Sequence, residues 1–199
     1  MELQVFKTDI KIEESNFLKS YLNKSQIMLE WGAGWSTLEF SKYVKEYYSI
    51  EHNFYWYQRV KSRIESNTKI YYAPPNTRDL KWFPPDKRGD KESFKSYIGF
   101  ADVLGSLGKR FDVVFIDGRA RSFCALKALD FLKEEAVVFI HDFGRPRYWD
   151  ILRRYSIVDI EGSMAALKTG GFDFENGRYF LIKKYLQNAE FKRQIIFDK

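Results

Sequence analysis

The sequence predicts an α/β fold: a doubly wound, mostly parallel sheet with helices on both faces and an antiparallel closing strand. Short apolar runs recur along the chain and alternate with segments in which apolar residues have helical spacing. This alternation indicates parallel strands, because each crossover helix covers one face of the sheet. A glycine-rich turn after the first apolar run favours the same fold, since ligands of such sheets bind beyond the carboxyl ends of the strands.

The apolar runs that we assign to strands are bounded by polar or turn residues. They cover residues 26–31, 47–51, 69–73, 111–116 and 136–140, followed by a closing pair at 156–160 and 164–168. Helical spacing predicts helices over residues 13–23, 36–44, 93–107, 147–155 and 179–188. A further helix is capped by Asn53 and buries Tyr57, Val60 and Ile64. The helix after residue 117 is expected to bury Phe123, Leu126, Leu129 and Leu132.

The chain length is that of one domain with a full core, which we expect to span residues 1–199. Within it we expect an N-terminal helix at 13–23, a core at 26–168 and a tail at 170–199. Residues 74–92 hold most of the prolines among charged residues, and this long loop also carries Trp82-Phe83. Apolar aromatics in a long charged loop favour a lid over a ligand site.

The composition excludes several classes of protein. A hydrophobic content of 45% and an aromatic content of 18% exclude a disordered chain. The single cysteine, Cys124, excludes an internal disulfide and a cysteine-rich zinc site, and is expected to be a small buried side chain. We find no signal peptide and no membrane-spanning segment, and therefore expect a soluble, cytoplasmic protein with no membrane partner. The oligomeric state is left open.

The charge balance gives a weak indication of partners. The net charge is +6, which favours anionic partners without identifying one. Lys and Arg are interleaved with Asp and Glu along the chain, so a solvated basic surface explains the excess better than a nucleic-acid footprint does. We expect a small-molecule or glycan substrate, with anionic character as one option.

The turn at residues 30–37, with the sequence EWGAGWST, is the most informative segment. Glycine lets a ligand lie directly against backbone because it has no Cβ. Dinucleotide folds require G-x-G-x-x-G in such a turn, and here Thr37 occupies the third glycine position. An oxidoreductase that uses a nicotinamide dinucleotide is therefore the less favoured interpretation of the turn.

Polar residues end the predicted strands and are the first candidates for chemistry. Glu51 follows the glycine turn by about twenty residues, the spacing of a ribose-binding carboxylate. Asp117, His141 and Asp142 end two strands that should be neighbours, so they are expected to converge. Two carboxylates and an imidazole suit either proton abstraction from a hydroxyl or a divalent metal site. A loop-stabilising histidine is the alternative for His141.

Arginines and tryptophans surround these strand ends. Arg119, Arg121 and Arg145 could orient a carboxylate or phosphate on a substrate, although some should pair with the local acids. Trp82, in the expected lid, is a further candidate for substrate contact. Trp31 and Trp35 flank the glycines, and core packing is the preferred interpretation for both.

With these residues the chain resembles class I S-adenosylmethionine (SAM)-dependent methyltransferases over residues 26–168. The matching features are Glu30-x-Gly32-x-Gly34 as motif I, Glu51 as the ribose acid, and the 111–118 segment FDVVFIDG as the strand-four motif. More narrowly, the motifs are similar to those of the glucuronoxylan O-methyltransferase and macrocin O-methyltransferase families. The resemblance implies a Rossmann-like methyltransferase fold with SAM as cofactor.

The resemblance also implies roles for individual residues. The expected cofactor contacts are Glu30, Gly32, Ala33, Gly34, Ser36, Thr37, Glu51, His52, Ala73, Asp117 and Gly118. Macrocin-type enzymes hold a divalent metal, here Mg or Mn, at positions that match Asp117 and Asp142. His141 stands where that family often has a second acid, which departs from its metal-binding pattern.

The expected function is transfer of a methyl group from SAM to a hydroxyl oxygen of a sugar or glycan. Asp117, His141 and Asp142 are the expected catalytic residues, acting directly or through a metal. The alternatives are a SAM-dependent methyltransferase acting on another small molecule or on RNA, and a SAM-fold binding module without catalysis.

Overall fold

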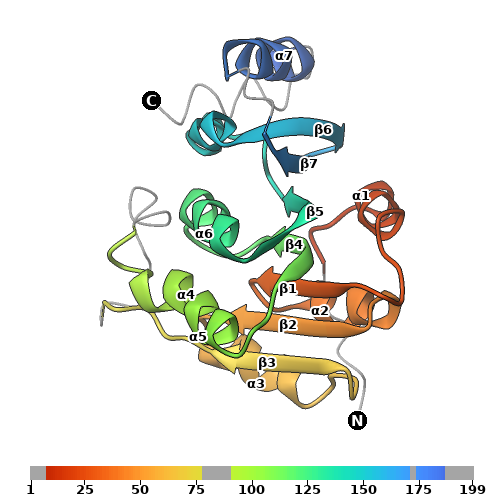
Figure 1. Cartoon of the computed structure of the whole chain (residues 1–199), viewed down its shortest axis with the longest axis vertical. Coiled ribbons are helices and arrows are strands. Elements are labelled where there is room, and N and C mark those ends of the chain that lie inside the picture. Colours follow the sequence, from red (N-terminus) through yellow and green to blue (C-terminus); the bar gives the residue numbers. More distant parts are fainter. Residues whose placement is uncertain (1–7, 78–90, 171–173, 187–199) are drawn as a thin grey trace.

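The computed structural model describes residues 8–77, 91–170 and 174–186. Its centre is a seven-stranded sheet in the order β3-β2-β1-β4-β5-β7-β6 (Figure 1). The parallel strands are β1 (Ile27–Trp31), β2 (Glu46–Glu51), β3 (Thr68–Tyr72), β4 (Phe111–Ile116) and β5 (Leu132–Ile140). β7 (Met164–Thr169) runs antiparallel between β5 and β6 (Tyr155–Glu161). The predicted fold class, including the antiparallel closing strand, is confirmed.

Helices cover both faces of the sheet. One face carries α1 (Ile12–Lys19), α2 (Trp35–Phe40) with the 3₁₀ turn η1 (Ser41–Tyr43), and α3 (Phe54–Lys61). The other face carries α4 (Lys95–Gly99), α5 (Ala101–Ser106), α6 (Arg121–Ala128) and η3 (Leu129–Phe131). The 3₁₀ helix η4 (Pro146–Arg153) and α7 (Phe174–Leu186) pack beside β6, at the top of Figure 1.

The central strands send alternate side chains into two separate cores, as the two-residue period of a strand requires. Leu29 and Trp31 of β1 belong to the core under α4, α5 and α6. Met28, which lies between them, packs with Leu18 of α1 and Phe40 of α2 on the opposite face. All of these side chains are fully buried. β1 is thereby packed on both faces of the sheet.

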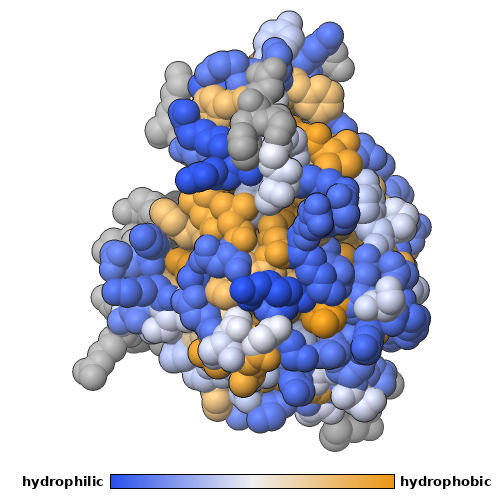
Figure 2. Space-filling view, in the orientation of Figure 1, coloured by the Kyte–Doolittle hydropathy of each residue, from blue (hydrophilic) through white to orange (hydrophobic). Residues whose placement is uncertain are grey.

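Two helices differ from their predictions. The helix expected at 93–107 is divided into α4 and α5 at Gly99-Phe100, where glycine weakens a continuous helix. The predicted buried face of α6 is wrong at Leu126, which is 39% exposed. Phe123, Leu129 and Leu132 pack against the core as expected, and Cys124, also expected to be buried, is fully buried together with Ala125. Figure 2 shows apolar surface on this face of the molecule, over the region of α6.

Other predictions hold with shifted boundaries. Asn53 caps α3, since its side chain accepts the Trp56 N–H at 3.2 Å. α7 begins at Phe174 rather than at residue 179, and Leu132 belongs to β5 rather than to a helix. Trp82 and most of the expected lid, residues 78–90, lie outside the described residues, as do 171–173 and 187–199 of the tail. In the described part, no helix has the length and apolarity needed to cross a bilayer.

Candidate functional site

A cavity of about 550 Å³ lies beyond the carboxyl ends of β1, β2, β4 and β5. This is the position at which open α/β sheets bind ligands. Most residues expected at the site line it: Gly32, Ala33, Gly34, Ser36, Glu51, His52, Asp117, Gly118, Arg119, Arg121, His141, Asp142 and Arg145. The expected cofactor contacts Glu30, Thr37 and Ala73 are described but are not part of this lining.

The glycine turn exposes its backbone to the cavity. Gly32 has a φ of +104°, a left-handed conformation that favours glycine. Gly34 is different, because its φ of −173° suits any residue, and a Cβ built there has no neighbour within 4 Å. The space beside Gly34 therefore belongs to the cavity, and a ligand could lie directly against this part of the chain.

Glu30 supports the turn from beneath and is fully buried. Its carboxylate accepts hydrogen bonds from the hydroxyls of Ser36, Thr37 (2.5 Å) and Ser49 (2.7 Å). Burial raises the pKa of Glu30 to about 7, although these hydroxyls lower it in part. Thr37, in the third glycine position, also accepts the Gly34 N–H at 3.0 Å. Glu30 and Thr37 thus fix the shape of the turn from the protein side.

Glu51 ends β2 beside the turn, and each of its oxygens accepts one backbone N–H. Oε2 accepts from Ala33 at 2.7 Å and Oε1 from Asn53 at 2.6 Å. His52 Nδ1 lies 3.1 Å from Oε1 but does not form a hydrogen bond with it. A carboxylate oxygen can accept two hydrogen bonds, so each oxygen retains capacity for a ligand hydroxyl. Ala73, by contrast, is 2% exposed and donates its backbone N–H to the Glu51 carbonyl at 2.8 Å.

Arg121 joins the two acids that end β4 and β5. One nitrogen of its guanidinium lies 3.1 Å from Asp117 Oδ1, and another lies 3.1 Å from Asp142 Oδ2. It also donates to the backbone carbonyls of Gly118 (3.0 Å), Asp117 (2.9 Å) and His141. Burial disfavours the cation, but the two acids raise the pKa of Arg121 overall. Arg121 therefore joins the ends of β4 and β5, and its N–H groups are used in contacts within the protein.

The two acids do not form the expected metal pair. Within residues 8–77, 91–170 and 174–186, no group of three or more His, Cys, Asp or Glu side chains could hold a metal ion. The physical reason is that the Arg121 guanidinium occupies the bridging position between Asp117 and Asp142. Arg145 approaches Asp142 Oδ2 as well, at 3.0 Å. Mg or Mn at these carboxylates does not fit this arrangement of charges.

Asp142 adopts a conformation that is uncommon for a residue other than glycine, with a φ of +59°. Aspartate tolerates this left-handed region better than most residues. Its Oδ2 carries both arginine contacts. The Oδ1 oxygen has no ion pair or hydrogen bond with the described residues.

His141 lies between two carboxylates. Its Nδ1 is 3.0 Å from Asp117 Oδ1, and its Nε2 is 3.3 Å from Glu14 Oε2. Burial lowers the pKa of His141, but hydrogen bonds to Asp117 and Glu14 raise it to about 10. Burial alone would also raise the pKa of Asp117, yet Arg121 and His141 lower it below its ordinary value. At neutral pH His141 is an imidazolium that donates both N–H groups and cannot accept a proton.

Sequence reasoning missed several parts of the site. The segment before α1 contributes Thr8, Asp9 and Ile10 to the lining, and α3 contributes Trp56. No strand-end rule selects these positions, because they lie before and beside the sheet. Trp31 is a core residue as preferred, fully buried with its Nε1–H bound to the Tyr97 carbonyl at 3.1 Å. Trp35, also expected in the core, lines the cavity and packs edge-on against Phe40.

Comparisons with solved structures identify the fold. A methyltransferase-like protein from Silicibacter pomeroyi superposes with a TM-score of 0.66 at 20% identity, over 89% of this chain and 96% of that one. A ribosomal protein L11 methylase from Lactobacillus delbrueckii gives 0.55 at 10% identity, over 85% and 83%. A TehB-like SAM-dependent methyltransferase from Corynebacterium glutamicum gives 0.50 at 12%, over 79% and 88%. No family model and no curated protein matches the sequence. The chain has the class I methyltransferase fold.

Proposed function

We propose that this protein transfers a methyl group from SAM to a hydroxyl oxygen, with sugars or glycans as the acceptor class. The observation that carries the proposal is one cavity lined by the glycine turn, Glu51 and Asp117 in a class I methyltransferase fold. The turn offers backbone at Gly34, and Glu51 offers two oxygens that still have hydrogen-bonding capacity. These are the features that an adenosyl ligand requires.

The residues of the cofactor half would act by binding. Glu51 would accept the two ribose hydroxyls, and the backbone beside Gly34 would contact the methionine portion. When bound, SAM supplies a methyl group on a positively charged sulfur. Glu30 and Thr37 would act indirectly, since their hydrogen bonds hold the turn in shape.

The acceptor half would be served by Asp117. Its Oδ1 is engaged by His141 and Arg121, whereas Oδ2 has no ion pair or hydrogen bond with the described residues. Oδ2 would therefore take the proton that the acceptor hydroxyl loses as its oxygen bonds to the methyl carbon, while the bond between that carbon and sulfur breaks and S-adenosylhomocysteine leaves. A carboxylate with a low pKa suffices, because the hydroxyl becomes strongly acidic as the new bond forms. Arg145 lines the same cavity and would suit an acidic sugar.

Cofactor binding is the first test. Calorimetric titration with S-adenosylhomocysteine should show binding to the wild-type protein and a loss of about tenfold or more with Glu51→Gln, which removes a charge-assisted hydrogen bond. Glu46→Gln is the matched control, because Glu46 begins the same strand and pairs with Lys109 away from the cavity. No measurable binding to the wild-type protein would overturn the proposal.

Acceptor chemistry is the second test. Wild-type protein with isotopically labelled SAM should transfer label to members of a panel of neutral and acidic sugars, read by mass spectrometry. Asp117→Asn should lower kcat by about a hundredfold or more while leaving S-adenosylhomocysteine affinity nearly unchanged. Label that appears only in RNA or only in an amine would exclude the proposed acceptor class.

A further inference from the structure

Glu14 is a buried carboxylate that no part of the proposed reaction uses. It lies in the first turn of α1 and is 1% exposed. Burial raises its pKa, but hydrogen bonds from His141 and other partners lower the pKa to about 2. An ionised carboxylate is costly to bury unless every oxygen is well partnered. The partners of Glu14 are therefore informative.

These partners come from three parts of the chain that are far apart in sequence. Oε1 accepts the backbone N–H of Ser163 at 2.7 Å and its hydroxyl at 2.8 Å, in the turn between β6 and β7. Oε2 accepts the Lys11 N–H at 2.9 Å, at the start of α1, and lies 3.3 Å from His141 Nε2. Glu14 thus joins α1, the β6–β7 turn and the end of β5.

Two of these contacts lead to the cavity. Lys11, whose N–H binds Glu14, directly follows residues 8–10, and these residues line one wall of the cavity. The other nitrogen of His141 holds Asp117 Oδ1 at 3.0 Å. The Glu14 carboxylate therefore fixes one wall of the cavity. Through the His141 ring it also holds Asp117, the carboxylate that we propose as the general base.

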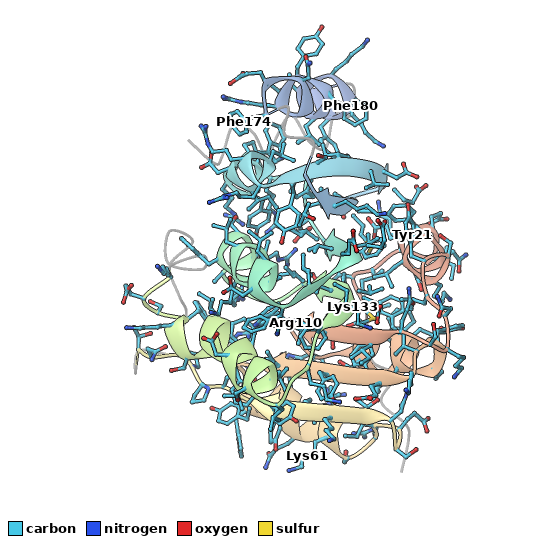
Figure 3. All side chains as sticks on the ribbon, in the orientation of Figure 1. Tyr21, Lys61, Arg110, Lys133, Phe174 and Phe180 are labelled. Atoms are coloured by element: carbon cyan, nitrogen blue, oxygen red, sulfur yellow. The ribbon has the colours of Figure 1, made fainter. Side chains whose placement is uncertain are left out.

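Apolar contacts also dock α1 on the sheet. Leu18 is fully buried in the core, and the rings of Phe17 and Tyr21 lie 5.7 and 5.2 Å from Phe139 of β5. Tyr21 is labelled beside α1 in Figure 3. The charged network beneath the helix is separate from these apolar contacts, and through His141 it reaches Asp117 at the cavity.

We propose that Glu14 is a positioning residue for the reaction: through His141 it orients Asp117, and through Lys11 it holds residues 8–10 as the acceptor-side wall. This inference rests on the proposed function for its catalytic part. The coupling from Glu14 to His141 is a property of the folded protein and can be measured without any substrate.

The coupling is tested by NMR titration of the histidines. The chain has two histidines, so the imidazole spectrum contains two sets of signals, which a His52→Gln variant assigns. The charged groups facing His141 are Glu14, Asp117 and Asp142, with Arg121 bound to its carbonyl. Glu14→Gln should lower the pKa of His141 by at least about one, since one of its carboxylate partners is lost. The His52 signal should be the same in Glu14→Gln as in the wild-type protein.

Glu13→Gln is the matched control, because Glu13 is the exposed neighbour in the same helical turn and should leave His141 unchanged. Glu14→Asp keeps the charge but shortens the side chain, which lengthens the 3.3 Å contact with His141 Nε2 and should produce a smaller shift in the same direction. This milder variant keeps the test decisive if Glu14→Gln does not fold. An unchanged pKa of His141 in the folded variants would overturn the coupling.

Kinetics test the catalytic part. Glu14→Gln should lower kcat by about tenfold or more relative to Glu13→Gln, with S-adenosylhomocysteine affinity within about twofold of the wild type. Glu14→Asp keeps the charge and should recover part of the loss. A lower pKa of His141 with an unchanged kcat would overturn the positioning role. Failure of the wild-type protein to bind S-adenosylhomocysteine would instead contradict the proposed function, and the titration would still report on the coupling.

Discussion

Gly32 and Gly118 lie back to back at the ends of β1 and β4. A Cβ built on Gly32 would come within 2.5 Å of the Gly118 nitrogen and 2.6 Å of its Cα. The Asp117 and Gly118 N–H groups both donate to the Trp31 carbonyl, at 3.0 and 2.8 Å. Backbone therefore touches backbone between two neighbouring strand ends, which fixes the floor of the cavity without any side chain.

Gly32→Ala should destabilise the protein by about 2 kcal/mol or more. The new methyl group would meet the backbone of Gly118, which has no flexible side chain to move, and the φ of +104° is itself unfavourable for alanine. The free energy of unfolding measured by urea denaturation checks this. A change of less than about 0.5 kcal/mol would contradict the close contact.

Gly34→Ala is expected to behave in the opposite way. Its extended backbone suits alanine, and no atom lies within 4 Å of the added Cβ, so unfolding should change little. Because that Cβ would occupy space in the cavity, S-adenosylhomocysteine affinity should fall by about tenfold or more. Calorimetry checks the affinity. An unchanged affinity would show that the ligand does not lie against Gly34.

Arg121→Met should destabilise the protein by about 3–5 kcal/mol, because it leaves Asp117 and Asp142 partly buried without their shared cation. Arg121→Lys should recover only part of this loss, since an ammonium cannot reproduce the planar set of contacts to both acids and three carbonyls. Urea denaturation of both variants measures the difference. Full recovery with lysine would mean that charge alone, and not geometry, holds the two strand ends.

The fold was predictable because its signals are local and mutually consistent. Each apolar run is short and is followed by helical spacing, and the parallel topology follows from that order. The exceptions are also local. Leu126 was expected on the buried face of α6, but it is 39% exposed, and the neighbouring Ala125 is fully buried. The apolar spacing alone did not distinguish these two adjacent positions.

The site was predictable to the extent that it is built from strand ends. Glu51, Asp117 and His141 were all found by that rule, and all line one cavity. Pairwise geometry could not be predicted in the same way. Glu14 contacts His141, which lies 127 positions later in the sequence. Nothing in the sequence around Glu14 distinguishes it from its exposed neighbour Glu13. The role of Arg121 as a bridge, likewise, depends on distances between separate strands.

The stability of the protein should be greatest near about pH 5 and fall on both sides. Glu14 has its pKa lowered from 4.5 to about 2, so the folded protein binds fewer protons and stability rises with pH across that range. Glu30 has its pKa raised from 4.5 to about 7, so stability falls as pH rises between these values. His141 has its pKa raised from 6.5 to about 10, which continues the fall at higher pH. Thermal unfolding across pH 2–10 checks the profile.

Single variants separate these contributions. Glu30→Gln should flatten the profile between pH 4.5 and 7, because the titrating carboxyl is lost. His141→Asn should flatten it between pH 6.5 and 10. It should also weaken the rise in stability between pH 2 and 4.5, because the hydrogen bond from His141 lowers the pKa of Glu14. Stability that rises between pH 7 and 9 in the wild-type protein would show that His141 is not held as an imidazolium.

Cys124 provides a probe of global unfolding. Its side chain is fully buried on α6, and burial raises the pKa of the thiol well above its ordinary value, so the reactive thiolate is both scarce and shielded. We expect negligible reaction with a thiol reagent under native conditions and complete reaction in denaturant. The labelling rate in intermediate urea should follow the fraction unfolded, because α6 packs in the main core. Rapid labelling in native buffer would show that α6 opens locally. Since a bound ligand stabilises only the folded state, S-adenosylhomocysteine should slow the labelling of the wild-type protein, and at the same ligand concentration it should slow that of Gly34→Ala less.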